Sequence, residues 1–178
     1  GVGMSAVEIG KAMGATVIGA ASSDEKLEVV KKAGADHLIN YSSGDLREQL
    51  KEIIGSKEAV DVLYDPVGAD LFEPALRSMK WKGRALVIGF AGGDDKIPKI
   101  PMNLPLLKGC SIVGVFWGSF RVRESKVEFD NFNQLFEWFN SGKIDPLVSD
   151  VYPLEEAPIA LRKLMNRQAI GKIVLTTE

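Results

Sequence analysis

Residues 1–23 read Gly-Val-Gly-Met-Ser-Ala-Val-Glu-Ile-Gly-Lys-Ala-Met-Gly-Ala-Thr-Val-Ile-Gly-Ala-Ala-Ser-Ser, and this opening indicates the architecture of the chain. Two glycines precede an apolar-rich segment, residues 4–13, which predicts a helix that ends at Gly14. Residues 16–21 form an apolar run that predicts a buried strand. Glycines before a helix that leads into a strand favour a phosphate-binding turn, because the free N–H groups and the dipole of a helix N-terminus attract anions. Taken alone, the two glycines are equally consistent with a simple turn.

The end of this first strand carries a second signal. A dinucleotide-binding fold places a ribose-binding group there, about 20 residues after its glycines. No Asp or Glu stands at this strand end to bind a ribose diol; Ser22, Ser23 and Lys26 instead offer hydroxyls, helix N-terminal amides and a positive charge. These groups suit a 2′-phosphate and favour NADP(H) over NAD(H). Ser22 and Glu25 also match a capping box, so we expect Ser22 to be the N-cap. The alternative is that Ser22 only caps the helix and Lys26 is a solvated charge.

Downstream, short apolar runs alternate with amphipathic segments. The pattern predicts helices at residues 24–33, 46–54, 71–79, 127–139 and 155–166, and strands at residues 37–40, 84–89, 111–116 and 172–176. Residues 17–20 and 60–63 are apolar without alternation, as expected for strands covered on both faces. Strands separated by helices indicate an α/β fold with a parallel sheet, because parallel neighbours need a crossover. The aromatic side of the helix at 127–139 predicts core packing by Phe129, Phe132, Phe136 and Phe139.

Composition excludes several classes of protein. The 178 residues carry 22 basic and 24 acidic side chains, so no strong overall field gathers nucleic acid or anionic lipid. One cysteine (Cys110) and one histidine (His37) exclude a disulfide framework, a Cys-rich zinc site and a His-based metal cluster. Apolar runs are far shorter than the roughly 20 residues that a membrane span needs, and no secretory signal pattern opens the sequence. We therefore expect a cytoplasmic protein with no metal, no nucleic-acid partner and no membrane association.

Short motifs along the whole chain resemble a known family. In order, they are Gly1-Val2-Gly3, Lys11-Ala12-Met13-Gly14-Ala15, Lys32-Ala33-Gly34-Ala35-Asp36, Ile39-Asn40-Tyr41, Asp65-Pro66-Val67-Gly68, Gly83-Arg84, Gly89-Phe90-Ala91-Gly92, Val113-Gly114-Val115-Phe116-Trp117-Gly118 and Gly171-Lys172-Ile173-Val174-Leu175. Together they resemble the cofactor-binding portion of medium-chain dehydrogenase/reductases, in the zinc-free quinone oxidoreductase branch of zeta-crystallin-like proteins. The resemblance covers essentially the whole chain.

The resemblance implies a Rossmann-type doubly wound parallel sheet that lacks its first strand and the N-terminal GroES-like lobe of the family. In the family order the missing strand lies in the middle of the sheet, so its absence leaves two unpaired interior edges. We expect the chain to be the second half of a longer protein, with another segment filling the gap. Residues 1–143 are then the NADP(H)-binding domain, and residues 144–178 are a C-terminal segment that returns toward the absent lobe.

The resemblance also assigns the cofactor contacts. Gly1, Val2 and Gly3 would face the pyrophosphate, and the 2′-phosphate would be held by Ser22, Ser23 and Lys26. Tyr41 would lie near the adenine, and Val67 and Gly68 would lie along the cofactor. The nicotinamide would be surrounded by Phe90, Ala91, Gly92, Phe116, Trp117 and Gly118. Alternatives remain for some of them. Tyr41 could also be an ordinary surface residue, and Phe90 could equally pack in the core. Phe116 and Trp117 could also form part of an interface. Asp65 either orients a ribose or starts the turn that follows it.

The implied activity is zinc-independent hydride transfer from NADPH to a small-molecule acceptor, a quinone or an activated alkene. No catalytic residue is assigned, because the groups that face the substrate would belong to the absent lobe, and we expect this chain to be inactive by itself. A homodimer through the strand at residues 111–116 is implied as well. The alternatives are a non-catalytic module for NADPH binding and dimerisation, and an enzyme that prefers NAD.

Overall fold

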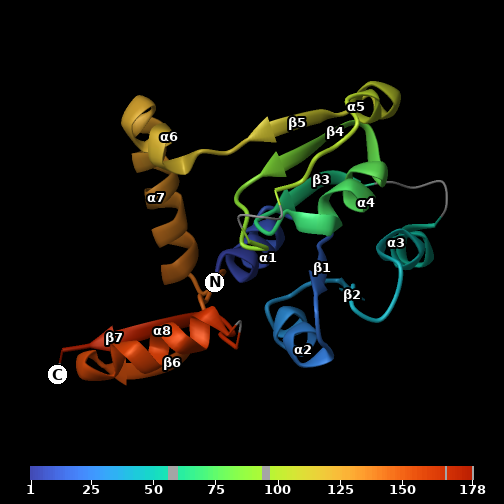
Figure 1. Cartoon of the computed structure of the whole chain (residues 1–178). Coiled ribbons are helices and arrows are strands. Elements are labelled where there is room, and N and C mark those ends of the chain that lie inside the picture. The colour runs from blue at the N-terminus through green and yellow to red at the C-terminus, as the bar shows by residue number, and fades with distance from the viewer. Residues whose placement is uncertain (56–59, 94–96, 167, 178) are drawn as a thin grey trace. The chain divides into compact units, whose positions relative to one another are not determined.

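The computed structural model describes residues 1–55, 60–93, 97–166 and 168–177 (Figure 1). Helices and strands alternate along almost the whole chain. Their order is α1 (Val2–Ala12), β1 (Ile18–Ala21), α2 (Asp24–Lys32), β2 (His37–Asn40), α3 (Leu46–Ile54), β3 (Val60–Asp65), η1 (Ala69–Leu71), α4 (Phe72–Arg77), β4 (Met79–Val87), α5 (Asn103–Lys108), β5 (Ser111–Gly114), α6 (Trp117–Arg123), α7 (Ser125–Asn140), β6 (Val148–Pro153), η3 (Leu154–Glu156), α8 (Ala157–Met165) and β7 (Lys172–Thr176).

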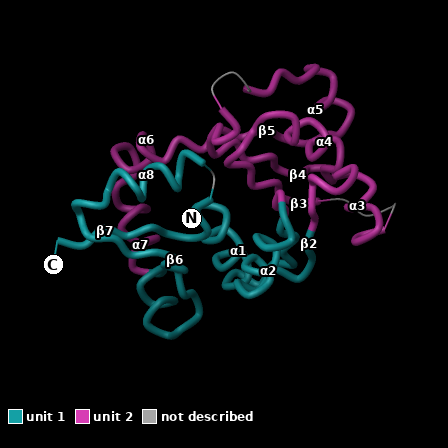
Figure 2. Tube along the Cα trace, turned by 60° about the horizontal axis from the view of Figure 1, so that its bottom comes forward, with its two compact units in different colours: residues 1–19, 23–38, 134–178 teal, residues 20–22, 39–133 magenta. Residues whose placement is uncertain are grey.

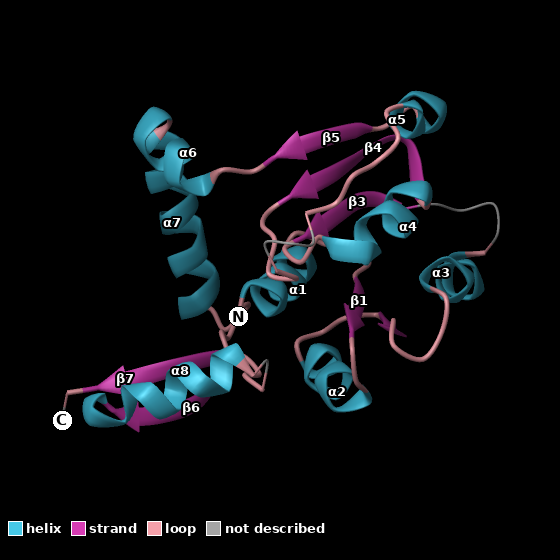
Figure 3. Cartoon of the chain, viewed as in Figure 1, coloured by secondary structure: helices cyan, strands magenta, loops and turns pink. Residues whose placement is uncertain are grey.

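The strands form three small sheets, ordered β1-β2, β3-β4-β5 and β6-β7 (Figure 3). β4 pairs in parallel with both β3 and β5, and β6 pairs in parallel with β7. This confirms the predicted α/β fold with parallel strands. Among the described residues, no ladder joins the β1-β2 pair to the β3-β4-β5 sheet.

The chain divides into two compact units (Figure 2). Unit 1 comprises residues 1–19, 23–38 and 134–178, and unit 2 comprises residues 20–22 and 39–133. In unit 1, α8 contacts β6, which pairs with β7. In unit 2, α4 and α5 pack against the three-stranded sheet.

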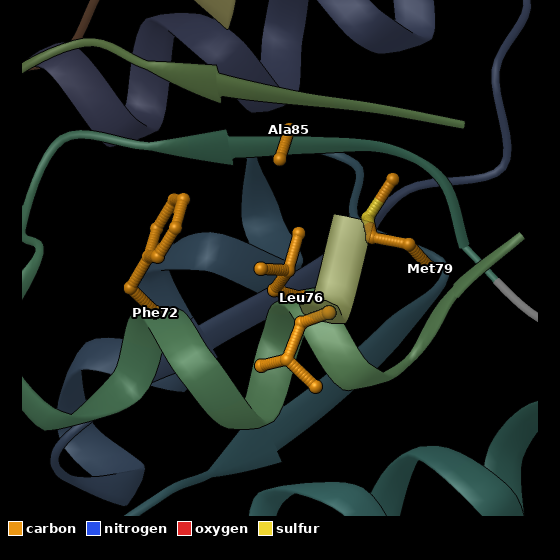
Figure 4. Close-up of a cluster of buried hydrophobic side chains, with 5 residues drawn as sticks. Phe72, Leu76, Met79 and Ala85 are labelled. Atoms are coloured by element: carbon orange, nitrogen blue, oxygen red, sulfur yellow. The ribbon is translucent and has the colours of Figure 1, made fainter. Parts of the chain in front are cut away.

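The principal core lies in unit 2, between α4 and the sheet (Figure 4). Phe72 and Leu76 lie four residues apart on α4, so they share one face of the helix. They pack with Met79 and Ala85 of β4 and with Leu104 of α5. Leu76 and Ala85 are completely shielded from solvent. Val60 and Leu63 of β3 and Val87 of β4 also pack against this core, which therefore joins α4 and α5 to these two strands.

Each of the two turns from helix to strand in unit 1 contains a glycine with positive φ. Gly14 and Gly34 come directly after the C-caps of α1 and α2, with φ of +83° and +100°. Asp36 joins these two turns, because its carboxylate accepts hydrogen bonds from Lys11 Nζ at 2.8 Å and from the Val17 N–H at 2.7 Å. The Lys11 ammonium, followed by the Val17 N–H, holds the pKa of Asp36 below its usual value. Asp36 therefore links the turn after α1 to the turn after α2.

The structure corrects three predictions about elements. The prediction that the aromatic side of the helix at 127–139 packs in the core is wrong, because α7 has no buried residue and its four phenylalanines are 42–66% exposed. A helical period indicates an apolar face but not what covers it. The helix predicted at 71–79 is shorter, since β4 already begins at Met79. The short helices α5 and α6 were not predicted, because six or seven residues carry too little periodicity.

Candidate cofactor-binding site

The amino end of α1 is the first part of the candidate site, and it lies in unit 1. Gly1 is the N-cap, and Val2 and Gly3 belong to the first turn, so only one of the two glycines precedes the helix. No side chain caps this end. A Cβ placed on Gly3 would meet no atom within 4 Å. The first turn therefore leaves room for an anionic group to approach its backbone N–H groups.

Lys172, the first residue of β7, is a positive charge beside this helix end that sequence reasoning missed. Its Nζ lies 3.9 Å from the position of a Cβ on Gly1. Lys172 could not be assigned to the site from the sequence, because no local pattern connects the last strand of a chain to its first helix.

The start of α2 provides the second part of the site, with one correction. The N-cap is Ser23 and not Ser22: Ser23 is extended, and its Oγ accepts a hydrogen bond from the Lys26 N–H at 3.4 Å. The predicted capping box of Ser22 and Glu25 is therefore wrong by one residue. Because the strand ends at Ala21, Ser22 still belongs to the connection, and the helix cap does not use its hydroxyl. Lys26 stands in the first turn of α2, half-buried.

Tyr41 follows β2 and lies near the end of β1. Its N–H donates to the Ala21 carbonyl at 3.1 Å. This bond brings Tyr41 next to the residue that precedes Ser22, and both belong to unit 2. The Tyr41 side chain is half-buried.

Asp65 ends β3 and shapes the turn that follows it. The residue is 8% exposed, and its Oδ1 accepts hydrogen bonds from the N–H groups of Val67 and Gly68, both at 2.9 Å. Gly68 has a φ of +69°, a conformation that favours glycine. Of the two interpretations of Asp65, these contacts support the turn. They give the Val67–Gly68 segment a defined shape at the carboxyl end of the strand.

The loop after β4 packs directly on this turn. The Ala91 N–H donates to the Pro66 carbonyl at 3.0 Å, and the Gly92 N–H donates to the Val67 carbonyl at 2.9 Å. A Cβ on Gly92 would lie 2.9 Å from the Val67 oxygen, which only glycine avoids. The Phe90 ring lies against Gly68, 3.0 Å from the position of a Cβ there, and is 41% exposed. Phe90 thus packs on the turn and still presents a surface.

The segment after β5 completes the part of the site in unit 2. The Val115 N–H donates to the Val87 carbonyl at 3.0 Å, so the pairing with β4 continues past the end of β5. Phe116 is the N-cap of α6, and Trp117 and Gly118 are in its first turn. Phe116 is 78% exposed and Trp117 is 54% exposed. Because β3, β4 and β5 are parallel neighbours, the segments that follow them all start at the carboxyl end of the sheet.

A cleft of about 760 Å³ opens elsewhere in unit 2, and none of the predicted site residues lines it. Its walls are Asp45, Arg47, Ala69, Asp70, Glu73, Pro74, Arg77, Ile97, Pro98 and Lys99, which mix three acidic with three basic side chains. In the part of the chain that the structure describes, no three His, Cys, Asp or Glu side chains are grouped to hold a metal ion. The same residues include no helix that is long and apolar enough to cross a bilayer.

Comparison with known proteins identifies the family to which the chain is similar. A profile of the family described as zinc-binding dehydrogenase matches residues 1–140. The chain is 39% identical over 162 residues to quinone oxidoreductase-like protein 2 of Bos taurus, covering 91% of this chain and 46% of that protein. It is 33% identical to a 2-haloacrylate reductase of Burkholderia sp, covering 98% of this chain and 52% of that protein. The crystal structure of Escherichia coli quinone oxidoreductase complexed with NADPH superposes with a TM-score of 0.86 at 32% identity, covering 98% of this chain and 53% of that one. The chain thus spans about half the length of the curated relatives it matches.

Proposed function

The chain belongs to the zinc-binding dehydrogenase family, and on this premise we propose that it binds NADPH and forms the cofactor-binding part of a quinone oxidoreductase-like enzyme. The relatives it matches include quinone oxidoreductase-like proteins and a haloacrylate reductase, so the acceptor we propose is a quinone or an activated alkene. Residues 1–143 would form the cofactor domain, and residues 144–178 the returning segment.

The residues of this chain fit the cofactor. Gly1, Val2 and Gly3 leave an uncapped helix end for the pyrophosphate, with Lys172 as a nearby cation. Ser22, Ser23 and Lys26 would hold the 2′-phosphate, and Tyr41 would lie along the adenine. The interlocked loops after β3 and β4, together with the segment after β5, would enclose the nicotinamide end. They contribute Val67, Gly68, Phe90, Ala91, Gly92, Phe116, Trp117 and Gly118.

One observation carries the proposal of NADPH rather than NADH. The connection from β1 to α2 carries two serines and, one turn later, Lys26, while no carboxylate stands at the strand end. A carboxylate there would bind a ribose 2′-OH and repel a 2′-phosphate. When bound, NADPH supplies the hydride; this chain orients the cofactor and keeps water from it. The metal-ligand set that the family description implies is not present among the described side chains, so we assign no step to a metal ion.

Calorimetric titration of the chain with NADPH and with NADH tests this proposal. We expect NADPH to bind at least about tenfold more tightly, because the 2′-phosphate gains charge-assisted hydrogen bonds. Equal affinity for the two cofactors would remove the 2′-phosphate assignment, and the absence of binding by either would remove the proposal.

Turnover separates the proposed enzyme from the second candidate, a module that binds NADPH without catalysis. We expect negligible NADPH oxidation when a quinone is added to this chain alone, and clear oxidation by a longer chain that also carries the GroES-like lobe of the family. A longer chain that binds NADPH but reduces neither quinone nor enone would support the module. Robust turnover by this chain alone would contradict its proposed incompleteness.

We further propose a homodimer in which β5 of one copy pairs with β5 of a second. β5 is an edge strand of its sheet, and Ile112, Val113 and Val115 are 37–40% exposed there. Val115 directs its N–H to β4, and the alternation of a strand therefore directs that of Ile112 to the outer edge.

The parent chain is expected to sediment as a dimer and the Ile112→Pro variant as a monomer, because proline removes the outward donor and leaves the bonds to β4 in place. Val122→Ser on α6, which alters a residue that is 83% exposed, should leave the dimer intact. A monomeric parent chain, or a dimeric Ile112→Pro variant, would contradict pairing through β5.

A further inference from the structure

Three side chains after β5 form a continuous series of contacts. The guanidinium carbon of Arg121 lies 4.8 Å from the centroid of the Trp117 ring. The Nε of the same arginine lies 2.8 Å from Oε1 of Glu128. All three residues belong to unit 2. Arg121 thus contacts an aromatic ring on one side and a carboxylate on the other.

The helices explain why these side chains meet. Trp117 and Arg121 are four residues apart on α6, so they lie above one another on one face of that helix. At Glu124 the backbone leaves the helical conformation, with φ −128° and ψ 43°, and α7 starts at the next residue. Glu128 lies in the first turn of α7, where its charge also suits the helix dipole.

Because Glu128 is buried, its carboxylate fixes the position of the Arg121 side chain. The Glu128 side chain is only 13% exposed, against 54% for Arg121. Its Oε1 is closed off from solvent and accepts no aligned hydrogen bond within the described residues, so its interaction with Arg121 is an ion pair. A shielded carboxylate is costly without its counter-ion. The guanidinium is therefore held in place, although the Arg121 side chain is about half exposed.

We infer that Arg121 and Glu128 are positioning residues for Trp117. The indole is 54% exposed and would otherwise change rotamer freely. The cation held over its face selects one orientation. The inference rests on the proposed function, which places Trp117 beside the nicotinamide. An oriented indole at that point strengthens the binding of the nicotinamide half of NADPH and does not affect the half that carries the 2′-phosphate.

Two ligands separate these halves in a binding experiment. NADPH contains the nicotinamide, whereas adenosine 2′,5′-bisphosphate contains only the adenine, ribose and phosphate groups. We expect Arg121→Gln to weaken NADPH binding about fivefold, because binding must then order the indole that Arg121 no longer holds, and to leave the affinity for the bisphosphate unchanged. Glu128→Gln should weaken NADPH in the same direction. Arg121→Lys, which keeps a cation, should restore most of the affinity. Arg123→Gln is the matched control, because Arg123 is on the same helix and bonds Ser119 rather than an aromatic ring.

Fluorine NMR of the chain labelled with 5-fluorotryptophan reports the orientation of the indole directly. The sequence contains three tryptophans, and Trp138 has its own cation, Lys143, so its resonance serves as an internal reference. We expect Arg121→Gln to shift and broaden the Trp117 resonance alone. An unchanged Trp117 resonance would overturn the inference, and so would equal losses of NADPH and bisphosphate affinity, or no loss of either. If the parent chain binds neither compound, the proposed function fails and the inference fails with it, even if the resonance responds.

Discussion

Replacement of Asp65 by alanine is expected to lower the free energy of unfolding by about 2–4 kcal/mol and to weaken NADPH binding. The Asp65 carboxylate is 8% exposed and accepts the N–H groups of Val67 and Gly68, both at 2.9 Å. Alanine leaves both donors without an acceptor, and each such loss costs about 1–3 kcal/mol. The loop after β4 bonds to this turn through Val67 and Pro66, so a disturbance of the turn spreads to the Phe90–Gly92 segment.

Asp65→Asn distinguishes the turn from a role of the negative charge. Asparagine keeps an Oδ1 acceptor at the same position, so this variant should retain most of the stability and of the NADPH affinity. Urea unfolding and calorimetric titration of the two variants measure both quantities. If Asp65→Asn loses as much as Asp65→Ala, the charge of Asp65 and not its place in the turn is what matters. If Asp65→Ala is as stable as the parent chain, the turn does not depend on this carboxylate.

Lys26→Ala is expected to weaken NADPH binding about 10- to 100-fold and to leave NADH binding unchanged. Lys26 stands in the first turn of α2, three residues after the N-cap Ser23. A charge-assisted hydrogen bond to a phosphate contributes about 1.5–3 kcal/mol, which corresponds to this range of affinities. The effect should decrease as salt is added, because the contact lies at the protein surface.

Lys32→Ala is the control for Lys26→Ala. Lys32 is an exposed lysine in the last turn of the same helix, so its removal changes the net charge equally but at the opposite end. We expect its NADPH affinity to match that of the parent chain. Equal losses of NADPH and NADH affinity in Lys26→Ala would contradict contact with a 2′-phosphate, and equal losses in the two lysine variants would point to a general effect of charge.

Much of the local structure could be predicted because it depends on neighbours within one or two turns. The bounds of β2, α3 and β7 were predicted to the residue, and Gly14 and Gly34 adopt the left-handed conformation that their positions after helices indicated. The N-cap of α2 was misplaced by one residue, because Ser22 and Ser23 are both good caps and only the end of β1 selects between them. The aromatic face of α7 was assigned to the core, although its pattern does not say what covers it.

Contacts between distant segments could not be predicted. Periodicity, caps and glycine positions act over three or four residues, and they were sufficient to indicate an α/β chain with parallel strands and a connection after β1 without a carboxylate. The approach of Lys172 to Gly1, the bond from Gly92 to Val67 and the ion pair of Arg121 with Glu128 depend instead on strand register and on the angle between helices. Register and helix packing arise only when apolar faces such as those of Leu76 and Ala85 come together, since burial and not local preference selects which segments meet.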